Sequence, residues 1–214
     1  MGEHAGGRLA MMKRRRRWAR RALISLSLLA AVCAAIFFAL PALLIAPAGE
    51  AKSDVMLCDA ISKHSTTDKY VIDLYRRGVA RKIVCVGSQV SHELYPSDYM
   101  RESLISQGVP AEDVISLRAP ITPCDAAYLA KLAEFAKANG WKSALYVTYP
   151  EASRYSGALA RKYFEREGVS LSVSYSPEDE NELTRDWWRT HWKTQRIVWE
   201  AMVIILDRFY SECR

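Results

Sequence analysis

Three aspartates lie at positions where an open α/β sheet usually carries its active-site residues. Asp59 follows an apolar run at 54–58, and Asp98 and Asp125 stand in the first turns of two expected helices. If the apolar runs are parallel strands, their carboxyl ends meet at one edge, where ligands of such sheets bind. Converging carboxylates there could bind a cation or act as acid and base, so Asp98 and Asp125 are the candidate catalytic residues. The alternative is that both only stabilise helix N-termini, by about 0.3–1 kcal/mol each.

Other residues near the same edge could bind an anion. Gly87, Ser88 and Thr122 could hold a phosphate through backbone amides at a helix start, and Asp59 would join them as a binding residue. Arg154 could clamp an anionic ligand, or it could be an exposed helix charge. No G-x-G-x-x-G and no Walker loop is present, so no cofactor is assigned. No His and Cys spacing typical of a zinc site occurs either, so no metal is assigned.

A serine hydrolase is a further alternative. Ser88 or Ser91 could combine with His64 or His92 and one of the aspartates. The chain contains no G-x-S-x-G elbow, which such enzymes of the α/β class carry. Solvated loop histidines are therefore the simpler interpretation.

The elements that must position these residues alternate along the chain. Apolar runs rich in β-branched residues predict strands, and amphipathic segments between them predict helices that stop at glycines. Five strands are expected at 54–58, 82–87, 113–117, 143–148 and 169–175, with helices at 67–77, 97–107, 124–139 and 151–167. This pattern predicts an α/β fold, a three-layer Rossmann-like domain with a mostly parallel five-stranded sheet. Alternation in the last run suits an edge strand.

A tryptophan-rich segment closes the chain. The sequence predicts one long helix from Asp186 to Tyr210, with Trp188, Trp192 and Trp199 on one face. One interpretation is that this helix packs across the sheet and closes the domain. The other is that some tryptophans touch the lipid interface, where amphipathic rings are frequent.

The N-terminal part of the chain predicts a membrane anchor. The segment Ala22–Ala46 carries no charge and is longer than the about 20 residues that a bilayer core requires. Pro41 should end or kink the helix near its far side. The alternative is a signal peptide cleaved near Ala46-Pro47-Ala48. In either case the basic tail at 1–21 predicts that the N-terminus is cytoplasmic and that the rest lies in the periplasm or outside.

The net charge of +6 comes entirely from that tail. Residues 1–21 hold eight of the 30 Lys and Arg residues and one of the 24 Asp and Glu residues, which leaves the remainder at −1. The soluble part therefore lacks the basic footprint of a nucleic-acid-binding protein. The predicted partner is the membrane, with an anionic small molecule or an envelope protein as further candidates.

The remaining 165 residues, 50–214, are enough for one domain after a short linker at 48–53. Its four cysteines are Cys58, Cys85, Cys124 and Cys213. Disulfides are permitted in an exported domain, and four cysteines allow three pairings. Because Cys58 and Cys85 fall within expected strands, buried free thiols are the simpler interpretation for these two.

The layout resembles one known family. Three stretches carry the likeness: GVARKIVCVG at 78–87, GVPAEDVI at 108–115, and the Trp-Trp-Arg before the last helix. With the anchor in front, the chain from Asp54 to Tyr210 resembles the SanA/ElyC/YdcF-like family of bacterial envelope proteins. The resemblance implies a role in cell-envelope biogenesis or integrity, through binding or processing an anionic ligand that is possibly lipid-linked.

The resemblance also places binding residues and shows where this chain departs from the family. Ser97-Asp98 stands where the family has Ser-Glu, and Thr148 keeps the family's threonine after the fourth strand, so Ser97 and Thr148 join the candidate ligand-binding residues. Asp59-Ala60 stands where the family has a Gly pair after the first strand, and Val86-Gly87-Ser88 stands where it has Ser-Gly-Gly after the second. Ala152 stands where a histidine is expected. Losing that histidine removes a proton carrier that works near neutral pH. The resemblance therefore also permits a non-catalytic scaffold or interaction module with a degenerate pocket.

Overall fold

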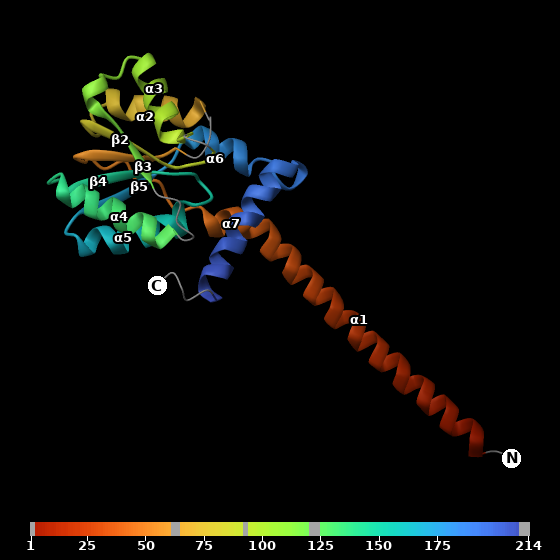
Figure 1. Ribbon diagram of the computed structural model, residues 1–214. Coiled ribbons are helices and arrows are strands. Elements are labelled where there is room, and N and C mark those ends of the chain that lie inside the picture. Colours follow the sequence, from red (N-terminus) through yellow and green to blue (C-terminus); the bar gives the residue numbers. More distant parts are fainter. Residues whose placement is uncertain (1–2, 61–64, 92–93, 120–124, 210–214) are drawn as a thin grey trace. The chain divides into compact units, whose positions relative to one another are not determined.

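A computed structural model describes residues 3–60, 65–91, 94–119 and 125–209 (Figure 1). The chain divides into two units, Met1–Leu40 and Pro41–Arg214, and each is treated separately below.

The first unit consists of helix α1 (Glu3–Leu44), whose last turn belongs to the second unit. In the described part of the chain, Arg20–Leu44 is the one stretch of helix long and apolar enough to cross a bilayer, a property that a signal sequence would share. Of the two outcomes predicted at Pro41, an end or a kink of the helix, the structure excludes an end. The helix continues to Leu44, and the Pro41 carbonyl accepts from the Ile45 amide at 2.9 Å, although proline lacks a donor and crowds the carbonyl four residues earlier.

The second unit contains a five-stranded sheet that is parallel throughout, which confirms the predicted α/β fold. The strands are β1 (Val55–Asp59), β2 (Lys82–Ser88), β3 (Val114–Ala119), β4 (Ser143–Val147) and β5 (Ser170–Ser174). Their spatial order is β3-β2-β1-β4-β5, so the predicted edge position of the last strand is confirmed.

Four helices cover the two faces of the sheet (Figure 1). Helices α2 (Ser65–Arg76) and α3 (Pro96–Ser106) lie on one face, and α4 (Asp125–Ala138) and α5 (Ser153–Arg166) lie on the other. A single 3-10 turn, η1 (Ala111–Asp113), precedes β3. The helices end before the glycines that the sequence marked as stops, at 78, 108, 140 and 168, and all four have positive φ.

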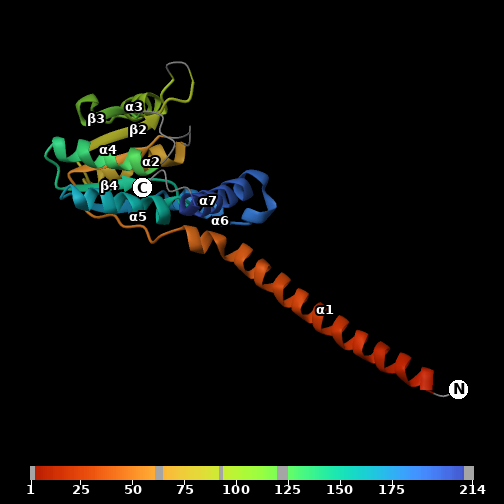
Figure 2. The ribbon, with the colours of Figure 1, turned by 60° about the horizontal axis from the view of Figure 1, so that its bottom comes forward.

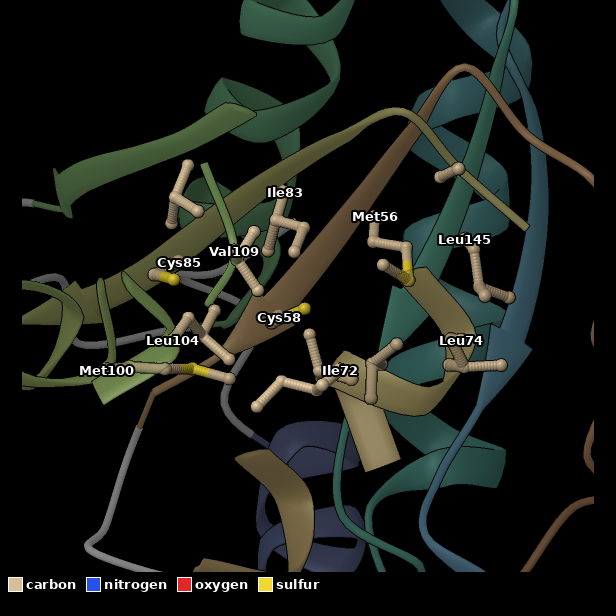
Figure 3. Packing of buried hydrophobic residues seen from close by; sticks show 14 of the residues in the cluster. Met56, Cys58, Ile72, Leu74, Ile83, Cys85, Met100, Leu104, Val109 and Leu145 are labelled. Carbon is tan, nitrogen blue, oxygen red and sulfur yellow. The ribbon is translucent and has the colours of Figure 1, made fainter. Parts of the chain in front are cut away.

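The core forms two layers because side chains alternate along each strand. Met56 and Cys58 of β1 face α2 and α3, where they pack with Ile83 and Cys85 (Figure 3). Val55 and Leu57 face α4 and α5 instead. The same alternation decides which face each residue at the carboxyl end of a strand occupies.

The C-terminal segment differs from the prediction of one long helix. It contains α6 (Pro177–Thr184), the 3-10 turn η2 (Trp187–Arg189) and α7 (His191–Phe209), which lie together at one end of the sheet (Figure 2). Ser176 caps α6, and Asp186 takes a left-handed conformation with φ 51° that breaks the helical path. Trp187 and Ile197 are buried, whereas Trp188, Trp192 and Trp199 are exposed, so α7 does not close the domain over its whole length as one interpretation expected.

The segment predicted as a linker is attached to the domain. The Gly49 amide donates to the Val173 carbonyl of β5 at 2.9 Å, and the Ser53 amide donates to the Val79 carbonyl at 2.8 Å. The Asp54 amide bonds the Ser143 carbonyl, and the Asp54 carboxylate accepts from the Lys142 and Ser143 amides. These bonds hold the chain along the domain from the residues after α1 to the start of β1.

Candidate functional site

The carboxyl ends of β1 and β4 form the topological switch point of the sheet. From β1 the chain proceeds to β2 and β3 on one side, and β4 and β5 then extend the other side. Helices that follow neighbouring strands therefore diverge to opposite faces at this position, where ligands of open α/β sheets bind.

Asp59 occupies the switch point, buried at the end of β1. Its Oδ1 accepts from the Tyr128 hydroxyl of α4 at 2.9 Å. Its Oδ2 accepts from the Thr148 hydroxyl at 2.8 Å and from the Tyr146 hydroxyl of β4. The structure thus brings two candidate ligand-binding residues, Asp59 and Thr148, into direct contact on the α4/α5 face.

This Asp59 cluster (Asp59, Tyr128, Tyr146 and Thr148) is a satisfied polar network. Each hydroxyl donates its proton to the carboxylate, and buried charges require such partners. The hydroxyls then retain only lone pairs for a further partner. The cluster therefore ties β1, β4 and α4 together, and it would accept hydrogen bonds from a ligand rather than donate them.

Gly87 and Ser97 meet on the opposite face. A Cβ at Gly87 would lie 2.9 Å from the Ser97 amide nitrogen and 3.1 Å from the Ala60 carbonyl oxygen. Gly87 is therefore required for close approach of the chain to itself, and the space its missing side chain leaves is taken by the first turn of α3. Ser88, the last residue of β2, is exposed.

Ser97 is not the N-cap of α3, although the expected helix at 97–107 began with it. Tyr95 occupies the cap and Pro96 the first helical position, where its missing N–H costs nothing. Ser97 is consequently fully buried in the first turn, and its Oγ has no hydrogen-bond partner among the described residues. An unpartnered buried hydroxyl is uncommon in native proteins.

Asp98 pairs with the edge strand β3 rather than with Asp59. It accepts from the Ser116 hydroxyl at 2.5 Å and from Arg118 Nε at 3.0 Å, and Arg118 Nη2 lies 2.8 Å away. The Ser116 hydrogen bond, followed by Arg118, lowers the pKa of the Asp98 carboxyl below its usual value. An acid for neutral pH needs a raised pKa, so the geometry favours Asp98 as a permanent anion.

Arg154 has a structural role that neither prediction anticipated. Its Nη2 donates to the Ile45 carbonyl at 2.6 Å and to the Ala42 carbonyl at 3.3 Å. These are carbonyls at the end of α1, which need donors from outside the helix. Arg154 therefore caps the last turn of α1.

Part of the predicted site falls outside the described residues. Thr122, His64 and His92 lie there, as do Cys124 and Cys213. Of Asp125 only the backbone is described, as the first residue of α4. Within the described residues, no group of three His, Cys, Asp or Glu side chains could hold a metal ion.

The two cysteines of the sheet are buried free thiols, as the simpler of the two interpretations expected. Cys58 and Cys85 are buried, lie opposite each other on β1 and β2, and form no disulfide. Burial raises the pKa of both thiols, so neither is a reactive thiolate at neutral pH.

Sequence reasoning missed a partly buried ion pair next to this edge. Arg196 Nε of α7 donates to Glu151 Oε1 at 2.5 Å, and its guanidinium lies over the rings of Tyr149 and Trp192. Glu151 Oε2 is buried without a partner among the residues described. Tyr128 and Tyr146 were missed as well. The only sequence signal was Tyr146-x-Thr148, two polar groups on one side of an otherwise apolar strand.

The candidate residues therefore fall into three places. Asp59 and Thr148 lie on the α4/α5 face, Gly87, Ser97 and Asp98 lie on the α2/α3 face, and Arg154 lies at the end of α1. A scan against protein-family models matched no family, and a search of curated proteins found no match to this chain.

Proposed function

We propose that the chain is a membrane-anchored protein of the cell envelope whose α/β domain binds an anionic ligand, lipid-linked or soluble, at the carboxyl edge of the sheet. The anchor would be the apolar helix Arg20–Leu44, with the basic tail in the cytoplasm and the domain in the periplasm or outside. The resemblance to the SanA/ElyC/YdcF-like family supports the envelope role.

The observation that carries the proposal is the Ser97 hydroxyl. It is the one candidate polar side chain on the α2/α3 face that is buried and unpartnered in the part of the chain that the structure describes. It stands in the first turn of an 11-residue helix, where the helix dipole favours an anion. An anionic oxygen would satisfy this hydroxyl.

Binding fits these residues better than catalysis. Asp98 is held as an anion by Ser116 and Arg118, and Asp59 already accepts three hydrogen bonds. Neither carboxylate is placed to exchange a proton at neutral pH.

The test is a thermal unfolding measurement on the full chain in detergent. The probes are inorganic phosphate, pyrophosphate and a polyprenyl phosphate in mixed micelles. A probe at 100 times its Kd should raise the free energy of unfolding by about 2.7 kcal/mol. Ser97→Ala should abolish that shift, and Ser106→Ala, which removes an exposed hydroxyl from the last turn of the same helix, should retain it. No shift with any probe would contradict ligand binding.

A second candidate function is a non-catalytic scaffold that docks on an envelope enzyme. The intramolecular contacts of three candidate residues favour the scaffold. The first turn of α3 fills the space beside Gly87, Asp98 pairs with Arg118, and Arg154 donates to the Ile45 carbonyl, so none of them is left open for a ligand. Complementation of a deletion strain by Ser97→Ala and Asp98→Asn separates the two. Full complementation supports the scaffold, and loss of complementation supports the ligand site.

The predicted orientation has its own test. A reporter enzyme that works only outside the cytoplasm, fused after Arg214, should be active. A fusion that is active only in the cytoplasm would overturn the orientation and the envelope role with it.

A further inference from the structure

Helix α7 exposes an apolar face that the domain does not use. The exposed large apolar side chains between 188 and 206 are Trp188, Trp192, Trp199, Met202, Ile205 and Leu206, and Trp199 is 62% exposed. Trp192, Trp199 and Leu206 repeat every seven residues, and Met202 lies beside them on the same side of the helix. A contiguous apolar surface of this kind marks an interaction site.

Buried and hydrogen-bonded side chains fix the first half of α7 to the domain. Arg196 bonds Glu151, the Thr194 hydroxyl donates to the Trp187 carbonyl at 2.9 Å, and Ile197 is fully buried. From Val198 to Asp207 no residue is buried. The large apolar side chains of the second half, Trp199, Met202, Ile205 and Leu206, are exposed instead.

The loop after β4 connects α7 to the point where the chain leaves the apolar span. On one side of this loop, Ser153 Oγ accepts from the Ala46 amide at 2.9 Å and Arg154 caps Ile45. On the other side, Glu151 holds Arg196 of α7. The membrane-proximal end of the domain and α7 are thus attached within four residues of each other, at the carboxyl edge of the sheet.

We propose that the apolar face of α7 lies in the lipid interface of the membrane that holds the Arg20–Leu44 span. This inference rests on the anchored state under the proposed function and adds a second membrane contact to it. Tryptophan rings prefer the headgroup region, with aliphatic side chains deeper. Trp192 and Trp199 at the start of the stripe, and Met202, Ile205 and Leu206 beyond them, match that chemistry.

The contact should depend on apolar surface rather than on lipid charge. Lys193 already donates to the carbonyls of Glu182 and Arg185, and Arg196 is paired with Glu151. Helix α7 also holds Arg208, and Glu200 and Asp207 offset two of its three cations, which leaves a net charge of only +1. Vesicles of pure phosphatidylcholine and vesicles with added phosphatidylglycerol should therefore give the same result.

The experiment is fluorescence quenching of the full chain, reconstituted in vesicles whose acyl chains carry bromine near the headgroup. Trp199→Phe should lower the bromine-sensitive emission, and the emission that remains should come from Trp192 on the same face and from Trp18 next to the span. The matched control is Trp141→Phe, which removes a tryptophan packed on Phe135 just before β4, at the opposite edge of the sheet. It should leave the bromine-sensitive emission unchanged.

Equal bromine quenching in the wild type, Trp199→Phe and Trp141→Phe would overturn the inference. A dimer would give a different result: Trp199 would be shielded both from bromine in the lipid and from acrylamide in the water. In that case the apolar face binds a second copy of the chain, and the inference is also wrong. A carbonate wash of the vesicles distinguishes failure of the anchor from failure of the α7 contact. Release of the chain refutes the anchor and the inference together, whereas retention without Trp199 quenching refutes the inference alone.

Discussion

At the carboxyl edge of the sheet, the aspartates on the two faces differ in burial and in hydrogen-bond partners. On the α4/α5 face, Asp59 is buried and is surrounded by hydroxyl donors of β4 and α4. On the α2/α3 face, Asp98 is partly exposed and pairs with a guanidinium of the edge strand. The first arrangement is a fixed part of the interior, and the second is a screened surface pair. The difference shows that equal residue types at equivalent strand ends need not form one site.

The largest effect is expected at Asp59. Asp59→Ala leaves three hydroxyl donors without their charged acceptor and should lower the free energy of unfolding by about 3 kcal/mol or more. Urea unfolding of the full chain in detergent, followed by circular dichroism, measures it. The control is Asp113→Ala, which removes a carboxylate bonded to Tyr75 and Lys82 next to η1, at the amino end of β3. An Asp59 effect no greater than that of Asp113→Ala would contradict the comparison.

An intermediate effect is expected at Gly87. Gly87→Ala puts a methyl group within 2.9 Å of a backbone nitrogen and 3.1 Å of a backbone oxygen, neither of which can rotate away. Overpacking of this kind costs about 1–3 kcal/mol. Gly49→Ala is the matched control because its nearest neighbour is 3.8 Å from the added atom. The thermal unfolding midpoints of Gly87→Ala and Gly49→Ala measure this cost. Equal midpoints for the two variants would show that α3 can shift to make room for the methyl group.

The smallest effect is expected at Asp98. Asp98→Asn removes a pair whose arginine side chain is 61% exposed, so solvent screening limits the loss to about 0.2–1 kcal/mol at pH 7. The pKa of Asp98 is lowered in the folded protein. Its contribution is therefore complete above the ordinary aspartate pKa of about 3.9 and is lost as the pH falls through the lower folded-state pKa.

The measurement for Asp98 is urea unfolding of the wild type and of Asp98→Asn at pH 7 and near pH 2. The difference between the two proteins should shrink at the lower pH. A difference that grew at low pH would mean that the carboxyl group stabilises the fold in its protonated form, which contradicts the ion pair.

Much of the fold could be predicted from the sequence because its signals are local. Apolar runs such as 82–87 give the strands, and the glycine stops end the helices between them. Helix α6 was missed because its sequence is polar, although Ser176, Pro177 and the acidic first turn carry a helix-start pattern. The break at Asp186 depends on a single left-handed residue.

The candidate site was less predictable because its contacts are distant in sequence. Tyr128 reaches Asp59 across 69 positions, and Arg154 reaches Ile45 across 109. The side-chain alternation of β1 and β2 was enough to show that Asp59 and Gly87 belong to different faces. The strand order was also required to show that Asp98 joins the outer strand.

The attached segment at 45–54 would limit how far the domain could travel from a bilayer that held Arg20–Leu44. Ten free residues would give a tether of about 35 Å when fully extended. Because this segment is bonded to the domain at both of its ends, that slack is lost. With Arg20–Leu44 in a membrane, the domain would stay within the layer of solvent next to the headgroups. Ligands held in the same leaflet would then meet it by two-dimensional diffusion, and those free in solution would have to come to the surface.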